Sequence, residues 1–278
     1  MIDASQPQAQ KAPQASATAP PPAVAAPPMV QMSHVHLSFG EKCILTDLNL
    51  TVAPRERLVI MGQSGGGKST TLRLILGILH PSSGSVKFKG EEVTHMNRPS
   101  LNRMRQHIVM VYHYSALISS LSVLDNLALP LEELTEKSEK EIDAIVEEKL
   151  TMVGMEETAN YMPSELSGGM KKRIGLARAL VLNPELILFD EPSAGLDPVV
   201  SSVIDELIIA LTDKTGATSI IVTHEMDSAF RIATRMAMLY QGKIIEEDSP
   251  EHFRHSSDPV VAQFVEGRTQ GPISTTQA

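Results

Sequence analysis

The stretch Gly62-Gln63-Ser64-Gly65-Gly66-Gly67-Lys68-Ser69-Thr70 decides the fold of this chain. It follows the apolar run 58–61, which is typical of a buried strand, and leads into 71–76, where apolar residues have helical spacing. A glycine, four residues and then Gly-Lys-Ser between a strand and a helix is the pattern of a phosphate-binding loop. The glycines let the backbone wrap around an anion, and the first amides of the helix point at it. The stretch therefore predicts that residues 62–70 bind a nucleotide, with Lys68 at the β- and γ-phosphates and Ser69 on Mg²⁺.

A Gly/Ser-rich turn before a helix is the alternative interpretation of the same stretch. It accounts for the glycines but not for a strand, a Lys and a Ser all in these places. We therefore expect a nucleotide site.

The composition of the 278 residues bounds the class of protein. Hydrophobic residues make up 42%, enough for a sizeable core in one large or two smaller domains. Cys43 is the single cysteine, which excludes an intramolecular disulfide and favours a small strand or core residue in a reducing cytoplasm. The net charge of −9 argues against a general nucleic-acid binder. Much of that charge lies in 131–157, with ten acidic and three basic residues, which we interpret as a solvated helical face.

The two ends of the chain differ from its middle. Residues 1–30 are rich in Ala, Pro, Gln and Ser, which predicts a disordered or polyproline-like tail. They lack the basic start and apolar core of a secretory signal. Beyond the N-terminal region, the stretch 108–124 also lacks charged residues but is interrupted by His113 and several serines, so we expect no membrane-spanning helix and a protein that is soluble by itself.

Several further elements are predicted from hydrophobic periodicity. Alternation predicts strands over Val35–Phe39 and Ile44–Val52, and Phe39 either stacks on an adenine or packs in the core. Ile108–Tyr112 predicts a buried strand of a sheet that is covered on both faces. Apolar residues at 3–4 spacing predict an amphipathic helix over Glu139–Met155.

A second dense stretch carries polar groups at strand and helix ends. Leu166-Ser167-Gly168-Gly169-Met170 opens a predicted helix over Lys171–Leu182. The apolar run 186–189 then ends in Asp190 and Glu191, which is how phosphate-loop enzymes place an acid on Mg²⁺ and a base beside the γ-phosphate; surface carboxylates are the alternative. The apolar run 219–223 ends in His224, either a satisfied strand-end histidine or a neighbour of the nucleotide, because open α/β sheets bind ligands at this edge.

Taken together, these motifs resemble the ATP-binding subunit of an ABC transporter over residues 31–250. Leu166-Ser167-Gly168-Gly169 is the family's signature, and other phosphate-loop ATPases lack it. The resemblance implies an α/β fold: a RecA-like phosphate-loop NTPase core, an antiparallel β subdomain and an inserted α-helical subdomain at about 114–180. Residues 1–30 would be a tail and 251–278 a C-terminal extension.

The resemblance also implies roles for individual residues. Gly62–Thr70 matches the Walker A loop, with Lys68 catalytic, while Ser69 and Asp190 would hold Mg²⁺. Glu191 matches the catalytic glutamate and Asp197 ends the D-loop. His224 falls on the catalytic switch histidine, and Phe39 falls on the adenine-stacking aromatic, which is usually Tyr.

Two positions depart from the family pattern. The Q-loop glutamine falls at His113, where an imidazole offers one ring nitrogen, and only while unprotonated. Either the imidazole keeps the nucleotide-binding role or coupling to the partner is altered. Met170, where many members carry Gln, is a milder departure.

The resemblance implies two copies arranged head to tail, with each ATP between Walker A of one copy and Ser167-Gly168-Gly169 and Asp197 of the other. The segment 113–133 would face membrane permease subunits, although its apolar residues also suit ordinary core packing. After Pro250, apolar residues predict an arm that packs on the core or on the second copy, followed by a loose end over Thr269–Ala278.

A narrower resemblance is to the ATPase of the Mla-type system, which moves phospholipids between bacterial membranes. It rests on Ser167–Arg173, on Ser193–Pro198 and on the C-terminal Asp258-Pro259, Gln263–Gly267 and Gly271–Ile273. It implies a peripheral protein on the cytoplasmic face of the inner membrane, with a lipid-binding periplasmic protein and a small regulatory subunit as further candidate partners. The rivals are an importer of amino acids or ions, a soluble non-transport ABC ATPase, and a non-hydrolysing regulatory module.

Overall fold

The computed structural model describes residues 27–273. The predicted disordered tail falls mostly on residues 1–26, which lie outside the described residues, as do 274–278. The backbone N–H of Met29 already donates to Val52 O at 2.8 Å, and the first strand begins at Val30. The folded chain therefore begins before residue 31.

The larger sheet has six strands in the order β10-β9-β3-β8-β7-β6. Five of them run parallel, and β10 pairs antiparallel with β9. Their bounds are β3 (Arg57–Met61), β6 (Ile108–Val111), β7 (Leu186–Asp190), β8 (Thr218–Val222), β9 (Arg235–Tyr240) and β10 (Lys243–Asp248). The central strands carry the phosphate loop, the two acids and His224 at their carboxyl ends, so one edge of the sheet gathers the predicted chemistry.

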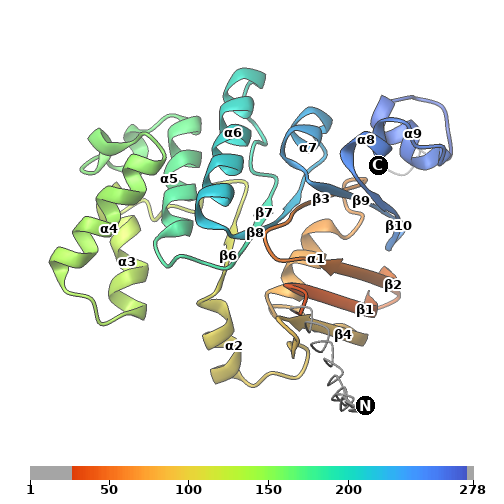
Figure 1. Ribbon diagram of the computed structural model, residues 1–278, viewed down its shortest axis with the longest axis horizontal. Coiled ribbons are helices and arrows are strands. Elements are labelled where there is room, and N and C mark those ends of the chain that lie inside the picture. The colour runs from red at the N-terminus through yellow and green to blue at the C-terminus, as the bar shows by residue number, and fades with distance from the viewer. Residues whose placement is uncertain (1–26, 274–278) are drawn as a thin grey trace, which may run out of the picture.

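The smaller sheet is antiparallel, in the order β2-β1-β4-β5. Its bounds are β1 (Val30–Phe39), β2 (Lys42–Val52), β4 (Ser83–Phe88) and β5 (Glu91–Glu92). Helix α1 (Lys68–Ile75) lies between the two sheets (Figure 1) and shares an apolar core with both. This core positions the phosphate loop, because α1 begins at the end of that loop.

The remaining helices lie around the larger sheet, except that α3 and α4 pack on each other and on α5, away from it (Figure 1). Their bounds are α2 (Arg98–Arg105), α3 (Val123–Leu134), α4 (Glu139–Met152), α5 (Gly168–Leu180), α6 (Pro198–Thr215), α7 (Met226–Ile232), α8 (Pro250–Arg254) and α9 (Pro259–Glu266), with short 3₁₀ turns at Glu156–Thr158 and Pro163–Glu165. Alternation along β3 divides the two cores: Leu58 and Ile60 face α1, whereas Val59 and Met61 join the core of α3 to α9. None of the helices within 27–273 is long and apolar enough to cross a membrane.

Two predicted elements are corrected by the structure. The strand predicted over Ile108–Tyr112 ends at Val111 and is an edge strand with half-buried residues, because helix α5 rather than a further strand lies beside it. Helix α5 begins at Gly168 instead of Lys171, since the Ser167 hydroxyl caps it by accepting the Met170 N–H. Cys43 lies in strand β2 and is exposed, which confirms the strand alternative and excludes the core one.

The segment after Pro250 packs on the core of the larger sheet. Phe253 and Val261 are fully buried there. The loose end predicted from Thr269 is wrong at Ile273, which is buried and whose backbone N–H donates to Gln263 Oε1 at 2.7 Å. The Gln263 amide in turn donates to Ile273 O and to Arg268 O, both at 3.2 Å.

Candidate functional site

The phosphate loop connects β3 to α1 in a conformation that requires glycine at its first residue. Gly62 has φ of 146°, and a Cβ there would lie 2.2 Å from the backbone oxygen of Leu239 on β9. No side chain is compatible with that approach. The loop is therefore held against the neighbouring strand.

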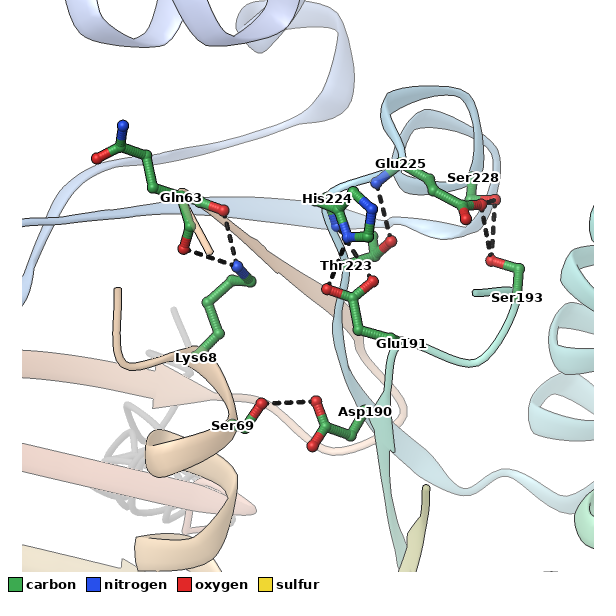
Figure 2. Close-up of polar contacts among 11 residues, drawn as sticks. Gln63, Lys68, Ser69, Asp190, Glu191, Ser193, Thr223, His224, Glu225 and Ser228 are labelled. Atoms are coloured by element: carbon green, nitrogen blue, oxygen red, sulfur yellow. Dashed lines mark hydrogen bonds and ion pairs between the residues drawn. The ribbon is translucent and has the colours of Figure 1, made fainter. Parts of the chain in front are cut away.

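Lys68 is the first residue of α1, and its side chain turns back into the loop (Figure 2). Its Nζ donates to Gly62 O at 2.7 Å and to Gln63 O at 2.9 Å. Burial lowers the pKa of Lys68, and the charges of Glu191 and Asp190 partly oppose that shift. A buried ammonium that donates to neutral carbonyls can also bind an anion strongly, and this fits a phosphate at this loop.

Asp190 ends β7 and meets the second residue of α1. Its Oδ1 accepts a hydrogen bond from Ser69 Oγ at 2.7 Å, and the carboxylate is almost fully buried. Oxygen ligands of this kind suit Mg²⁺, which is usually held by one or two protein oxygens and completes its shell with phosphate and water. Within 27–273, no group of three or more His, Cys, Asp or Glu side chains is arranged to hold a metal. The residues present thus fit a nucleotide-bound Mg²⁺ at Ser69 and Asp190.

Glu191 directly follows this strand and pairs with His224 (Figure 2). The His224 Nδ1 lies 2.9 Å from Glu191 Oε1, and the His224 backbone N–H lies 3.4 Å from Oε2. The Glu191 backbone has φ of 54°, in the left-handed region, and its N–H donates to Val222 O at 2.9 Å. A left-handed conformation in a residue other than glycine costs free energy and persists where the surrounding structure maintains it, here through the bond to Val222.

These residues line one cleft of ≈ 420 Å³, here called the phosphate-loop cleft. Its lining is Ser64, Gly65, Gly67, Lys68, Ser69, Thr70, Arg73, His113, Asp190, Glu191, Ala194 and His224. His113, which departs from the family pattern, therefore lies beside the phosphate loop. Its ring packs edge-on against Tyr114 at 4.7 Å, and its backbone oxygen accepts a hydrogen bond from the buried Lys172 of α5.

A second cleft of ≈ 500 Å³, here called the glycine cleft, lies at the start of α5. Its lining is Ser167, Gly168, Gly169, Met170, Arg173, Gly195, Leu196, Asp197 and Val200. Asp197 caps α6, where its Oδ1 accepts the backbone N–H groups of Val199 and Val200 at 3.0 Å each. Gly169 is required for close approach, because a Cβ there would lie 2.8 Å from Val200 Cγ1. The two clefts have no lining residue in common.

The predicted site residues are thus divided rather than brought together. The loop, Asp190, Glu191, His113 and His224 meet in one cleft, whereas Ser167–Gly169 and Asp197 form the other. Phe39 lines neither cleft; it is 52% exposed at the end of β1, which excludes the core-packing alternative.

Two basic residues of these clefts were not predicted. Arg73 of α1 lines the phosphate-loop cleft, and Arg173 of α5 lines the glycine cleft. The signal for both was present in the sequence: each is a cation on a helix that begins at a glycine-rich turn, five residues after Lys68 and five after Gly168.

Comparison with known proteins adds to this geometry. Residues 45–194 match the model of the ABC transporter family. The intermembrane phospholipid transport system ATP-binding protein MlaF of Escherichia coli K12 is 39% identical over 245 residues, which cover 88% of this chain and 91% of MlaF. A protein described as the probable ribonucleotide transport ATP-binding protein mkl of Mycobacterium tuberculosis H37Rv is 39% identical over 248 residues, 89% of this chain and 69% of that protein.

Solved structures of similar fold agree. The ATP-binding cassette MJ0796, in a dimeric post-hydrolysis state bound to ADP and phosphate, superposes with a TM-score of 0.72 and 33% identity. The match covers 80% of this chain and 99% of that one. The structure of cbiO1 from Clostridium perfringens, part of the transporter complex cbiONQ, gives a TM-score of 0.78 and 27% identity, over 87% of this chain and 96% of cbiO1.

Proposed function

The chain belongs to the ABC transporter family and is an ATPase of that kind, and from this premise we propose that it works as a homodimer that drives a membrane permease. The observation that carries the dimer is the separation of the two clefts. Each has half of what an ATP needs: one offers a lysine, an Mg²⁺ site and two acids, and the other offers the amides at the start of a helix. Head-to-tail pairing of two copies would join unlike clefts and complete two sites.

In each completed site the chain's own residues divide the work. Lys68 and the loop amides would bind the β- and γ-phosphates, and Phe39 would stack on the adenine. Ser167, Gly168 and Gly169 of the second copy would contact the γ-phosphate from the opposite side. Asp197 would hold the D-loop at the junction, since it already caps α6.

Hydrolysis requires Glu191 to accept a proton from the attacking water. In the described structure one oxygen of its carboxylate is paired with His224 Nδ1, and in our proposal this contact opens when Glu191 orients the water. His224, which is 60% exposed in its side chain, would then turn to the γ-phosphate. Ser69 and Asp190 would hold Mg²⁺, which supplies positive charge that offsets the charge developing on the transferred phosphoryl group.

ATP binding would thus hold the dimer together, and loss of the γ-phosphate would release it. ATP shifts the equilibrium toward the dimer only by the difference between its affinity for the dimer and its affinity for the separate chains. This cycle gives the permease two alternating arrangements to respond to.

The test of these roles is Glu191→Gln, with exposed Glu206→Gln as the matched control. We expect the Glu191 variant to bind ATP, to form a stable ATP-bound dimer in size exclusion, and to lose hydrolysis by about 100-fold or more. The control should hydrolyse ATP at the normal rate. Near-normal turnover in the Glu191 variant would rule out its role as catalytic base.

For the cargo we propose phospholipid, moved between bacterial membranes by a permease that this chain drives from the cytoplasmic face of the inner membrane. The support is the MlaF relative, whose length the match covers almost fully. The C-terminal residues that resemble the same branch form α9 and its packed end, a second region of likeness outside the ATPase motifs. A lipid-binding periplasmic protein and a small regulatory subunit would complete the assembly.

The cargo is tested separately from the ATPase. The chain would be co-expressed with its permease, reconstituted in proteoliposomes, and its ATPase rate measured with added phospholipid, ribonucleotide or amino acid. Stimulation and transfer of a fluorescent phospholipid are expected. Stimulation by ribonucleotide alone would transfer the assignment to the function named for mkl, and stimulation by amino acid would favour an importer.

A further inference from the structure

A buried polar network lies behind the phosphate-loop cleft and involves none of the residues assigned so far. Ser193 Oγ donates to Glu225 Oε2 at 3.0 Å. Ser228 Oγ donates to Asp205 Oδ2 at 2.7 Å and lies 3.5 Å from Ser193 Oγ. Arg231 Nη1 donates to the same Asp205 oxygen at 2.6 Å. Ser193, Ser228 and Asp205 are all almost completely buried.

The network joins the two loops that carry the proposed catalytic pair. Ser193 is two residues after Glu191, and Glu225 directly follows His224 and stands at the start of α7. Figure 2 shows the two connections side by side: His224 to Glu191 at the cleft, and Ser193 to Glu225 behind it. The first is exposed to solvent on the histidine side, whereas in the second Ser193 is buried and Glu225 is half-buried.

The two connections differ in burial. The His224–Glu191 contact lies at the cleft, where the His224 side chain is 60% exposed. The Ser193–Glu225 bond holds a hydroxyl that is almost completely buried, and breaking it would leave that hydroxyl only its 3.5 Å contact with Ser228 Oγ. Its far end is fixed as well, because Glu225 and Ser228 are on the same helix and Ser228 is bonded to Asp205 of α6.

We propose that Glu225 is a positioning residue for hydrolysis: by accepting the Ser193 hydroxyl it keeps the Glu191 loop and the His224 loop in register while the contact between Glu191 and His224 opens and closes. The proposal rests on the roles given above to Glu191 and His224. Glu225 is proposed to contact neither the nucleotide nor the attacking water, and to act through the backbone that carries His224.

The Ser193–Glu225 bond can be removed by substituting either residue, and a conservative substitution of either residue can keep it. We expect Glu225→Ala and Ser193→Ala each to lower kcat about tenfold while the KM for ATP changes less than about twofold, because positioning errors act on the chemical step. Glu225→Gln and Ser193→Thr keep an acceptor oxygen and a hydroxyl and should retain most of kcat. The double alanine variant should be no slower than the single ones, because one bond is lost in all three.

A second measurement separates positioning from a general loss of structure. The ¹⁵N signals of the His224 ring should move in Glu225→Ala and Ser193→Ala but keep their wild-type shifts in Glu225→Gln, with unfolding midpoints close to wild type. Normal kcat in Glu225→Ala would overturn the proposal. A double alanine variant slower than either single variant would also overturn it, and so would a Glu225→Gln variant as slow as Glu225→Ala. If Glu191→Gln is inactive while Glu225→Ala is normal, this inference fails and the proposed function stands; an active Glu191→Gln overturns the proposed function itself.

Discussion

The phosphate-loop cleft and the glycine cleft differ in what their polar groups are bonded to. In the first, reactive side chains are paired with one another or with the loop: Ser69 with Asp190, His224 with Glu191, Lys68 with two carbonyls. In the second, the polar side chains cap helices, as Ser167 does for α5 and Asp197 for α6. In the proposed function the first cleft carries out the chemistry and the second binds the γ-phosphate. The difference supports the proposal that a complete site needs one cleft from each of two copies.

The sharpest test of this comparison is complementation between two inactive chains. Lys68→Ala disables the first cleft, and Gly169→Val, whose Cβ would lie 2.8 Å from Val200 Cγ1, disables the second. Each variant alone should lose nearly all hydrolysis. A 1:1 mixture should regain it in mixed dimers, each of which has one intact composite site. With random pairing of the chains, roughly a quarter of all sites in the mixture are then intact.

Wild-type chain mixed with the double variant Lys68→Ala/Gly169→Val provides the control, because those mixed dimers contain no intact site. A Lys68→Ala and Gly169→Val mixture as inactive as its components would contradict the shared site.

The metal side of the first cleft is tested by Asp190→Asn and Ser69→Ala. Each removes one oxygen ligand while leaving the other, so the Mg²⁺ concentration for half-maximal hydrolysis should rise about tenfold for Ser69→Ala and more for the acid. Titration of ATPase activity with Mg²⁺ measures this. Asp197→Asn, on the glycine cleft, keeps its capping oxygen and should leave the Mg²⁺ requirement unchanged; a shift there would mean that the clefts do not divide the work as described.

Phe39 belongs to neither cleft, so its effect should be on binding alone. Phe39→Ala removes the ring that would stack on adenine, worth about 1–3 kcal/mol per base, and should raise the KM for ATP about tenfold with little change in kcat. Phe39→Tyr should retain wild-type behaviour. An unchanged KM in the alanine variant would return Phe39 to a surface residue without function.

The smallest effect on activity is expected far from both clefts. Gln263→Ala leaves the buried N–H of Ile273 unpaired, at a cost of about 1–3 kcal/mol in the free energy of unfolding. At about 2–4 °C per kcal/mol for a chain of this size, the unfolding midpoint should fall by several degrees. Steady-state kinetics at 25 °C should remain those of wild type; altered kinetics would show that the C-terminal segment acts on a cleft.

Much of the site was predictable because its residues follow strict local rules. A strand, a glycine-rich turn with Lys and Ser, and a helix form a unit whose geometry depends little on the rest of the chain. The acids at 190–191 and His224 were placed correctly at strand ends because parallel strands present their carboxyl ends at one edge. The division into two clefts came from the family resemblance, since periodicity carries no information on which helix ends face which cleft.

The errors fall where burial depends on distant partners. An apolar run such as Ile108–Val111 predicts that both faces of a strand are covered. It does not show whether the strand is hydrogen-bonded to a neighbouring strand at both of its edges. Ile273 has no apolar neighbour in the sequence that would indicate burial, and its buried position depends on the side-chain amide of Gln263, ten residues away. The bond between Ser193 and Glu225 joins residues 32 positions apart and leaves no pattern in the sequence.

The strand order of the larger sheet bears on how the chain is made. The central strand β3 lies between β8 and β9, so Val59 pairs with Ile221 and Met236, residues translated long after it. Gly62 is seated against Leu239 of that last partner. On the ribosome, the phosphate loop is synthesised early but has no wall to rest on until residue 239 has emerged. The phosphate loop therefore reaches the conformation described above only after residues 235–240 of β9 have been synthesised.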